Sequence, residues 1–194
     1  MKYILGIDEC STGSWAGPAY AAGVISNDLG LEDLDDSKKL SKEERMVLAK
    51  AIKDFTGLKY KIVSRSAQEI DQLGLANALK SMYNEIINDL YVDDTSVIID
   101  GAIKSGIDKS PTFLVRGDSK IKQIMAASII AKDARDSEML ELSKIYNKYN
   151  FENNAGYGTK DHMELLEKYG VCDIHRKSYK PIIKILERKN VLLP

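Results

Sequence analysis

The chain has 194 residues, of which 44% are hydrophobic and 29% charged, and its formal net charge is −1. This length and composition are ordinary for a soluble globular protein that buries a full core. Two distant cysteines exclude a disulfide framework and a zinc site, and no apolar run reaches the roughly 18 to 20 residues that span a bilayer. We therefore expect a reduced, cytoplasmic protein with no membrane segment, and nothing indicates more than a monomer.

The first half of the chain predicts strands separated by a turn and by helices. The strands are expected at 2–7, 19–26 and 59–66. Between the first two lies a turn rich in Gly and Ser. Two Ser residues, Ser41 and Ser66, each stand three residues before a Glu, which is the spacing of a capping box. Apolar stripes follow both, and the second helix is expected to run to about residue 90.

The second half predicts two more strands and a helical end. Runs at 96–100 and 112–118 read as strands, and a long helix that is nearly apolar in its first turns follows them. Thr159 can cap a shorter helix that stops at Gly170, and Pro181 can open a last one. Because strands come early and alternate with helices, the expected class is α/β with a mixed sheet.

Acidic residues close three of the predicted strands: Asp8 and Glu9 in GIDE, Asp100 in VIID and Asp118 in VRGD. Binding sites in open α/β sheets lie at strand ends, and carboxylates grouped there would repel one another unless a cation joined them. Oxygen ligands without a His or Cys cluster favour Mg²⁺ or Mn²⁺. Adjacent strand residues point to opposite faces, so the first two acids share a site only if the chain turns there. Each acid taken singly is more often a turn or cap residue.

Six sequence blocks, in order along the chain, favour a metal site over ordinary turn or cap residues. They are GIDEC…AGPAYAAGV, DDSKKLS, VSRSAQEIDQLGLANALKSM, VIIDG, RGDSKIKQIMAASIIAKDARDSEM and GYGTKDHMELLEKYGVCDIHRKSYKPI. Together they resemble the ribonuclease HII family, the type 2 ribonucleases H, over nearly the whole chain.

The resemblance implies a ribonuclease H-like fold: a central mixed sheet flanked by helices, with a helical C-terminal extension. Residues 1–150 would form the catalytic core, and residues 151–194 a substrate-contacting part of the same domain. It implies that Asp8, Glu9, Asp100 and Asp118 bind Mg²⁺ or Mn²⁺, two ions when substrate is present. The implied reaction hydrolyses the RNA strand of an RNA–DNA hybrid and leaves a 3′-hydroxyl and a 5′-phosphate, in line with two-metal phosphodiester chemistry.

The residues expected to contact the substrate follow the family pattern only in part. Tyr157 matches the family tyrosine that packs on the sugar at an RNA–DNA junction, and Lys38 and Lys39 are candidates for phosphate contact. The turn Ser11-Thr12-Gly13 stands where the family usually has Gly-Arg-Gly, so the arginine donor to phosphate is missing and Ser11 alters the turn if that position needs a positive φ. Cleavage at a single ribonucleotide embedded in duplex DNA is the activity that this change is most expected to weaken.

Two alternatives remain: a hybrid-binding protein that has lost activity or shifted its specificity, and a DNA-directed nuclease of the same fold. No sliding-clamp peptide is seen at the C-terminus. Residues 175–189 hold six Lys or Arg against one acid, a local basic stripe that can bind phosphates. His162 and His175 are expected to be structural.

Overall fold

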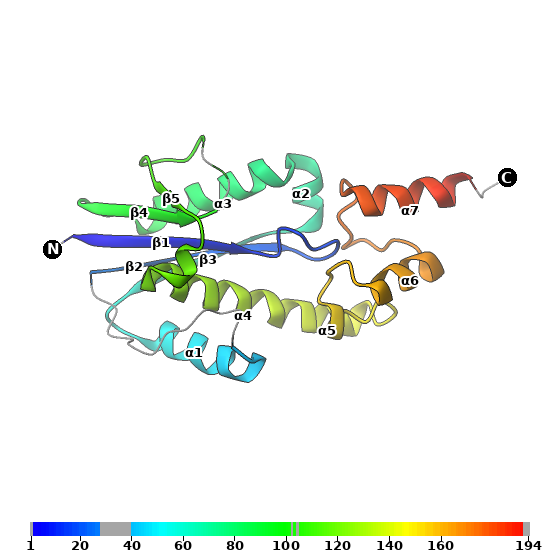
Figure 1. The fold of residues 1–194 in the computed structure, drawn as a ribbon, viewed down its shortest axis with the longest axis horizontal. Helices are drawn as coiled ribbons and strands as arrows, with labels where there is room; N and C mark the ends of the chain where they lie inside the picture. The colour runs from blue at the N-terminus through cyan, green and yellow to red at the C-terminus, as the bar shows by residue number, and fades with distance from the viewer. Residues whose placement is uncertain (1, 28–39, 102, 104, 192–194) are drawn as a thin grey trace. The chain divides into compact units, whose positions relative to one another are not determined.

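The computed structural model describes residues 2–27, 40–101, 103 and 105–191 (Figure 1). Its strands are β1 (Tyr3–Cys10), β2 (Ala19–Ser26), β3 (Lys59–Arg65), β4 (Thr95–Asp100) and β5 (Thr112–Leu114). Its helices are α1 (Lys42–Asp54), α2 (Ala67–Leu73), α3 (Leu75–Leu90), the 3₁₀ turn η1 (Gly117–Ser119), α4 (Lys122–Ile145), α5 (Phe151–Asn154), α6 (Lys160–Tyr169) and α7 (Lys180–Val191). None of the helices in these ranges is both long enough and apolar enough to cross a bilayer.

The five strands form one sheet in the order β3-β2-β1-β4-β5. Strand β1 pairs antiparallel with β2 and parallel with β4, and β4 pairs parallel with β5. The sheet is therefore mixed, and the predicted α/β class with a helical C-terminal extension is confirmed.

The described residues group into two compact units. The sheet unit takes its residues from Met1–Cys10, Tyr20–Ser64 and Leu79–Ala134, and the second unit from Ser11–Ala19, Arg65–Ala78 and Arg135–Pro194. The sheet unit thus holds the sheet with α1, most of α3 and the first half of α4. The second unit holds the turn after β1, α2, the rest of α4 and helices α5 to α7.

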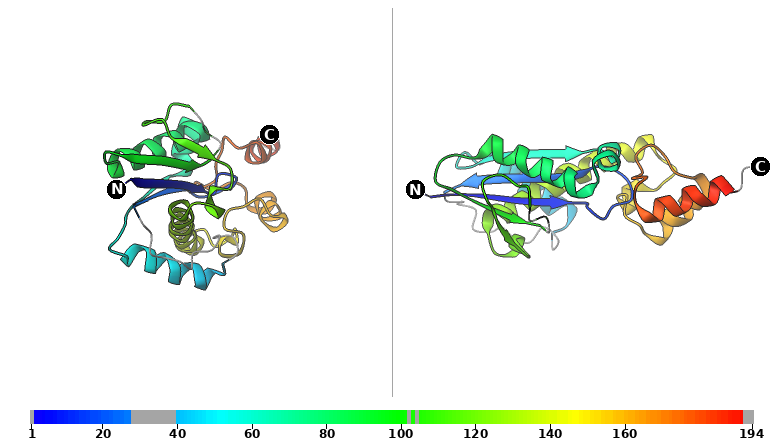
Figure 2. Two further views of the ribbon diagram at one scale, coloured as in Figure 1. Left: turned by 60° about the vertical axis from the view of Figure 1, so that its left-hand side comes forward. Right: turned by 90° about the horizontal axis from the view of Figure 1, so that it is seen from above.

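In the sheet unit, α1 and α4 cover one face of the sheet and α3 covers the other (Figures 1 and 2). Two glycines allow this close packing. A Cβ on Gly6 would lie 2.5 Å from the backbone nitrogen of Ile124 in α4, and one on Gly23 would lie 2.3 Å from Ile86 in α3. The core on the α4 face is fully buried and is made of Ala22, Val24, Ala49, Ile52, Ala126, Ala127, Ile129, Ile130 and Ala131. Its many alanines let α4 lie close to the strands.

The second unit has its own core. Its buried members come from the turn after β1 and from all the elements that follow the middle of α4; they are Ala16, Met139, Tyr149, Phe151, Leu166, Ile182 and Ile185. A glycine again marks the closest approach, since a Cβ on Gly156 would lie 2.4 Å from the carbonyl oxygen of Ala16. The turn at residues 11–19 is therefore packed into this unit.

The predicted helix starts are confirmed. Ser41 and Ser66 both form complete capping boxes, and Thr159 accepts a hydrogen bond from the His162 amide at the start of α6. One boundary was wrong: the helix expected to run from Ser66 to about residue 90 is two helices. Gly74 ends α2 with a φ of 75°, a conformation that a continuing helix cannot contain.

Candidate active site

The pairing of β1 with β4 brings two of the predicted acids together. Their parallel register sets Asp8 directly beside Asp100, at the carboxyl ends of both strands. Asp118 joins them from a different element than expected. Strand β5 ends at Leu114, Arg116 turns the chain with a φ of 58°, and Asp118 lies in η1 just before α4. Its amide donates a hydrogen bond to the Asp100 carboxylate at 3.2 Å, and its side chain is buried.

The prediction that a third strand ends on Asp118 was therefore wrong, although the residue still reaches the strand ends. A strand could not have delivered it, because the left-handed turn at Arg116 interrupts the extended chain.

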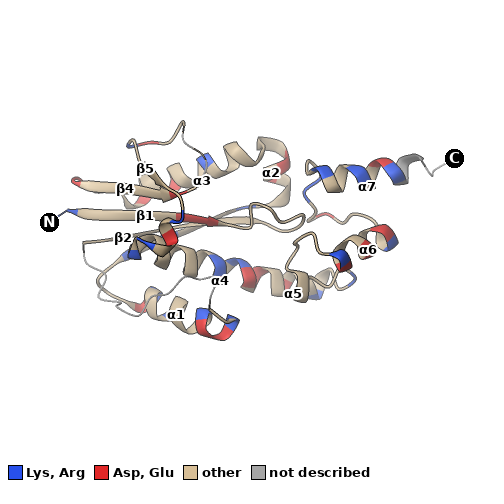
Figure 3. Cartoon of the chain, viewed as in Figure 1, with Lys and Arg blue, Asp and Glu red and all other residues tan. Residues whose placement is uncertain are grey.

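Asp8 and Glu9 lie on opposite faces of β1, because the strand continues through both to Cys10 without turning. On the α4 face, Asp8 receives a hydrogen bond from Ser128. On the α3 face, the Tyr83 hydroxyl donates a hydrogen bond of 2.6 Å to the Glu9 carboxylate. The backbone amide of Glu9 also donates to the Asp8 carboxylate at 2.8 Å. The charge of Asp100 acts on both acids, and the acidic stretch of β1 is visible in Figure 3.

Burial and mutual repulsion disfavour the charged forms of these acids. Burial raises the pKa of Asp8 well above its ordinary value, and the negative charges of Glu9 and Asp100 raise it further. Burial likewise raises the pKa of Glu9 to about 7; Asp100 adds to this shift, and the hydrogen bond from Tyr83 opposes it. Among the described residues, no Lys, Arg or His forms an ion pair with Asp8, Glu9 or Asp100. Asp8 is buried and Glu9 and Asp100 are partly buried, so within the described part of the chain these carboxylates lack a compensating positive charge.

A hard divalent cation fits this donor set. Carboxylate oxygens are the ligands that Mg²⁺ and Mn²⁺ prefer, and the repulsion within the group is what a cation relieves. Within the described ranges, no three Asp, Glu, His or Cys side chains are placed so that together they could hold a metal ion. Asp8 and Glu9 point to opposite faces of the sheet, which keeps these two carboxylates apart. Mg²⁺ commonly takes one or two protein carboxylates and completes its shell with water and substrate phosphate.

The turn after β1 lies in the second unit, where side chains of that unit donate hydrogen bonds to its backbone. Ser11 has a φ of 67°, which shows that this position does require the left-handed region that favours glycine. The Thr12 carbonyl accepts hydrogen bonds from Arg176 at 3.2 Å and from the Tyr179 hydroxyl at 2.7 Å. Gly13 has open space around its Cα, so this glycine is not needed for packing.

Tyr157 lies close to this turn. Its hydroxyl is 3.4 Å from the Ser11 hydroxyl, and 37% of the residue is exposed. The structure thus places Asp8, Glu9, Asp100 and Asp118 near the ends of β1 and β4 in the sheet unit, and Ser11, Thr12, Gly13 and Tyr157 together in the second unit. Lys38 and Lys39 fall outside the described residues.

Three buried polar residues near these groups were missed by the sequence analysis. Tyr83 holds Glu9, Arg176 holds the turn, and Arg135 lies behind the Tyr157 ring. The two arginines are fully buried, although arginine is ordinarily a surface residue. Their positions in the ARD and HRKS motifs were the available clue, but a motif does not say which way a side chain points.

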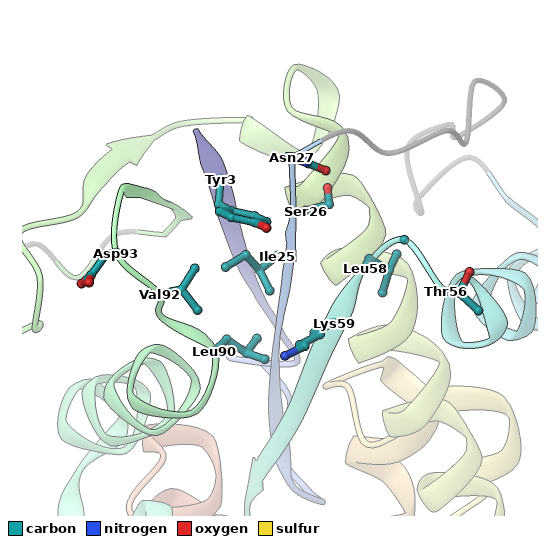
Figure 4. Close-up of a pocket in the computed structure, with 11 residues that line it drawn as sticks. Tyr3, Ile25, Ser26, Asn27, Thr56, Leu58, Lys59, Leu90, Val92 and Asp93 are labelled. Atoms are coloured by element: carbon teal, nitrogen blue, oxygen red, sulfur yellow. The ribbon is translucent and has the colours of Figure 1, made fainter. Parts of the chain in front are cut away.

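A cavity of about 390 Å³ lies at the other end of β1, away from the acids (Figure 4). Its lining mixes apolar side chains such as Ile25 and Leu90 with polar and charged ones such as Asn27, Lys59 and Asp93. The carboxylates at the ends of β1 and β4 are not part of this cavity.

The strand order, the flanking helices and the acids at the strand ends define a protein of the ribonuclease H-like fold. The crystal structure of the ribonuclease H2 from Pyrococcus horikoshii OT3 shares this fold with a TM-score of 0.80, at 24% identity over 97% of this chain and 99% of that one. The crystal structure of Bst-RNase HIII in complex with Mn²⁺ has a TM-score of 0.75 at 17% identity, covering 96% of this chain and 70% of that one.

The chain belongs to the ribonuclease HII family, whose model matches residues 5–182. A ribonuclease HII of Francisella tularensis subsp. novicida (strain U112) is 44% identical over 185 residues, which cover 94% of this chain and 99% of that protein. The family resemblance stated from the sequence is confirmed, and membership identifies the chain as a nuclease of the hydrolase class.

Proposed function

We propose that the chain is an endoribonuclease that hydrolyses the RNA strand of RNA–DNA hybrids and leaves a 3′-hydroxyl and a 5′-phosphate. The observation that carries the proposal is the register that sets Asp8 beside Asp100, with Glu9 and Asp118 next to them. Among the described residues, Asp8, Glu9 and Asp100 have no basic partner. This arrangement supports a metal-dependent cut more than a passive binding role, because buried uncompensated carboxylates are costly to keep.

Asp8, Glu9, Asp100 and Asp118 would hold Mg²⁺ or Mn²⁺, two ions when the hybrid is bound. When bound, such ions lower the pKa of a water and stabilise the developing charge on the leaving oxygen. The relative named above with Mn²⁺ has the same fold, which is consistent with this cofactor.

The chain's own residues have defined tasks in this scheme. Ser128 and Tyr83 orient the first two acids from opposite faces of the sheet. The small side chains of the turn would let its backbone approach the ribose 2′-hydroxyl, which distinguishes RNA from DNA. Tyr157 would pack on a sugar beside the cut. The basic side chains of α7, drawn blue in Figure 3, would contact phosphates of the substrate.

Cleavage at a single ribonucleotide in duplex DNA is a second proposed activity, and it depends on the turn. The arginine expected there is replaced by Thr12, while Arg176 lies buried with a nitrogen 3.2 Å from the Thr12 carbonyl. Arg176 can therefore stabilise the backbone of the turn, but its buried position does not offer the exposed phosphate donor that the family arginine provides.

The test is a cleavage gel with end-labelled RNA–DNA hybrid, duplex DNA carrying one ribonucleotide, and branched all-DNA substrate, in Mg²⁺ and separately in Mn²⁺. We expect the hybrid to be cut, and Asp100→Asn to lower the rate by at least about 100-fold with the fold intact. Asp93→Asn is the matched control, since Asp93 is an exposed acid at the other end of the sheet. Full activity in the Asp100 variant would refute the assignment, and cleavage of the branched DNA would favour a DNA-directed nuclease.

A further inference from the structure

The backbone around Tyr157 is held in an unusual conformation. Two consecutive residues before it, Ala155 and Gly156, have φ values of 47° and 76°. The Gly156 carbonyl accepts hydrogen bonds from the amides of Trp15 at 2.8 Å and Ala16 at 3.2 Å. The Tyr157 amide in turn donates to the Asn154 carbonyl at 2.9 Å. The loop that carries the tyrosine is thus joined to the turn after β1 by main-chain hydrogen bonds.

A buried pair of histidines fixes the Tyr157 carbonyl from the other side. The Cys172 amide donates to Nδ1 of His175, so the proton of this ring is on Nε2. That nitrogen lies 3.0 Å from Nε2 of His162 and donates to it. The His162 proton is therefore on Nδ1, which donates to the Tyr157 carbonyl at 2.9 Å. Each imidazole uses both nitrogens, and the tautomers follow from the hydrogen-bond partners.

The side chain of Tyr157 is oriented by Arg135. The guanidinium carbon lies 5.2 Å from the centre of the Tyr157 ring, within the range of a cation–π contact. One terminal nitrogen donates to the Ser14 hydroxyl at 3.1 Å and to the Ala155 carbonyl, and the other pairs with Asp136 at 3.2 Å. One guanidinium therefore contacts the turn, the loop and the aromatic ring at once.

Burying Arg135 costs free energy of desolvation, which argues against a role in stability alone. Arg135 is fully buried, and its Nε has no hydrogen-bond partner within the described part of the chain. Removing a guanidinium from water costs several kcal/mol, which a single partly exposed carboxylate offsets only in part. A buried apolar side chain would fill the same space without that penalty, but it would not make the three directed contacts.

We propose that Arg135 is a positioning residue that sets the Tyr157 ring, relative to the turn at Ser11–Ser14, for contact with the substrate sugar. The proposal rests on the proposed function, because it assigns Arg135 a role through Tyr157. Lysine cannot take this role, since its ammonium lacks the planar fork that reaches Ser14 and Ala155 with one nitrogen and Asp136 with the other while facing the ring.

The test is a double-mutant cycle of Arg135→Lys and Tyr157→Ala, with kcat and KM measured on the hybrid and on duplex DNA with one ribonucleotide. We expect each single change to lower kcat/KM by about tenfold and the double variant to be no worse than Tyr157→Ala. Independent losses that multiply to about 100-fold would overturn the proposal. Ser14→Ala removes only one acceptor of Arg135 and serves if the lysine variant is unstable; its loss must also vanish in the Tyr157→Ala background.

Backbone hydrogen exchange gives a readout that does not depend on activity. We expect the amides of residues 154–158 to exchange at least about tenfold faster in Arg135→Lys than in the wild type. Arg188→Lys is the matched control, because Arg188 is an exposed arginine of the same unit that pairs with Glu167 at 2.8 Å. Unchanged exchange at 154–158 would overturn the positioning role. If the wild type cuts neither substrate and residues 154–158 still exchange faster in Arg135→Lys, the positioning role of Arg135 is supported and the proposed function is refuted.

Discussion

Two groups of buried ionisable side chains behave in opposite ways. The acids at the ends of β1 and β4 lack basic partners among the described residues, and burial raises the pKa of Glu9 to about 7. His162 and His175 have a hydrogen bond at every ring nitrogen, and burial lowers the pKa of both, that of His175 to about 3. Burial thus favours the neutral forms of Asp8 and Glu9 and of both histidines, but the histidines have all their hydrogen-bond partners, whereas the acids lack a positive partner among the described residues.

The difference agrees with the proposal that the acids are functional, and it indicates that the histidine pair is structural. A satisfied pair gains nothing from a ligand, whereas uncompensated carboxylates gain from a cation. A substitution in the first should therefore change activity more than stability, and one in the second should change stability more than activity.

Asp8→Asn should separate the two properties most strongly. We expect cleavage to fall by at least about 100-fold, because the proposed metal site loses a carboxylate. In metal-free buffer we expect the free energy of unfolding to rise by about 1 kcal/mol, because repulsion with Glu9 and Asp100 is removed. Urea unfolding and cleavage assays check both results. In addition, Mg²⁺ should raise the unfolding temperature of the wild type but not that of the variant; a variant less stable than the wild type in metal-free buffer would contradict this account.

His175→Ala should have the reverse profile. It leaves a cavity and removes the donor to His162, so we expect a loss of about 2–4 kcal/mol in the free energy of unfolding. Urea unfolding measures it, with Lys177→Ala as the exposed neighbouring control. A loss below about 0.5 kcal/mol would show that the imidazole pair is not a structural element.

The two groups should also oppose each other in pH dependence. Below about pH 6.5 an unfolded chain protonates His175 while the folded pair stays neutral, so this stabilisation is lost as the pH falls toward 3. Glu9 binds its proton more tightly in the folded state, so its contribution to stability falls as the pH rises from about 4.5 to about 7. Without metal, the free energy of unfolding between pH 4.5 and 6.5 should therefore rise more steeply with pH in Glu9→Gln than in the wild type. Parallel curves would contradict the comparison.

Tyr83→Phe tests how the acids are held. The change removes the donor to Glu9 but keeps the ring, so we expect metal affinity and cleavage to fall by about tenfold with little change in stability. Metal titration followed by activity measures both. Tyr91→Phe is the control, because this nearby tyrosine lies outside the acid cluster. An unchanged metal affinity would show that Tyr83 only fills space.

Ser11→Gly should have the smallest effect. Relief of the left-handed backbone is worth about 1–2 kcal/mol, and glycine's greater freedom in the unfolded chain offsets about 0.5–1 kcal/mol of it. We expect a net gain of about 0.5 kcal/mol in the free energy of unfolding. Gly13→Ser is the control: with open space around it, the substitution should leave stability unchanged or slightly raised. A loss of stability on Ser11→Gly would show that the Ser11 hydroxyl matters more than the backbone strain.

The local features of this protein could be predicted from the sequence alone. The capping boxes at Ser41 and Ser66 and the Thr159 cap depend on neighbours within a few residues, so the sequence contains the necessary information. The strands were predicted only in part, because the first continues past residue 7 to Cys10 and the last ends at Leu114 instead of residue 118. The family and its four acids followed from ordered motifs, which carry the chemistry of the site without its geometry.

The tertiary structure decided the rest. The placement of Asp118 in η1, the opposite orientations of Asp8 and Glu9, and the burial of Arg135 could not be read from the sequence. Each depends on residues distant in the chain: the β1–β4 register, α3 and α4 on either face, and a loop packed on a turn some 140 positions earlier. Sequence patterns report local conformation and average burial, whereas the direction of a buried polar side chain is set by the partner that satisfies it.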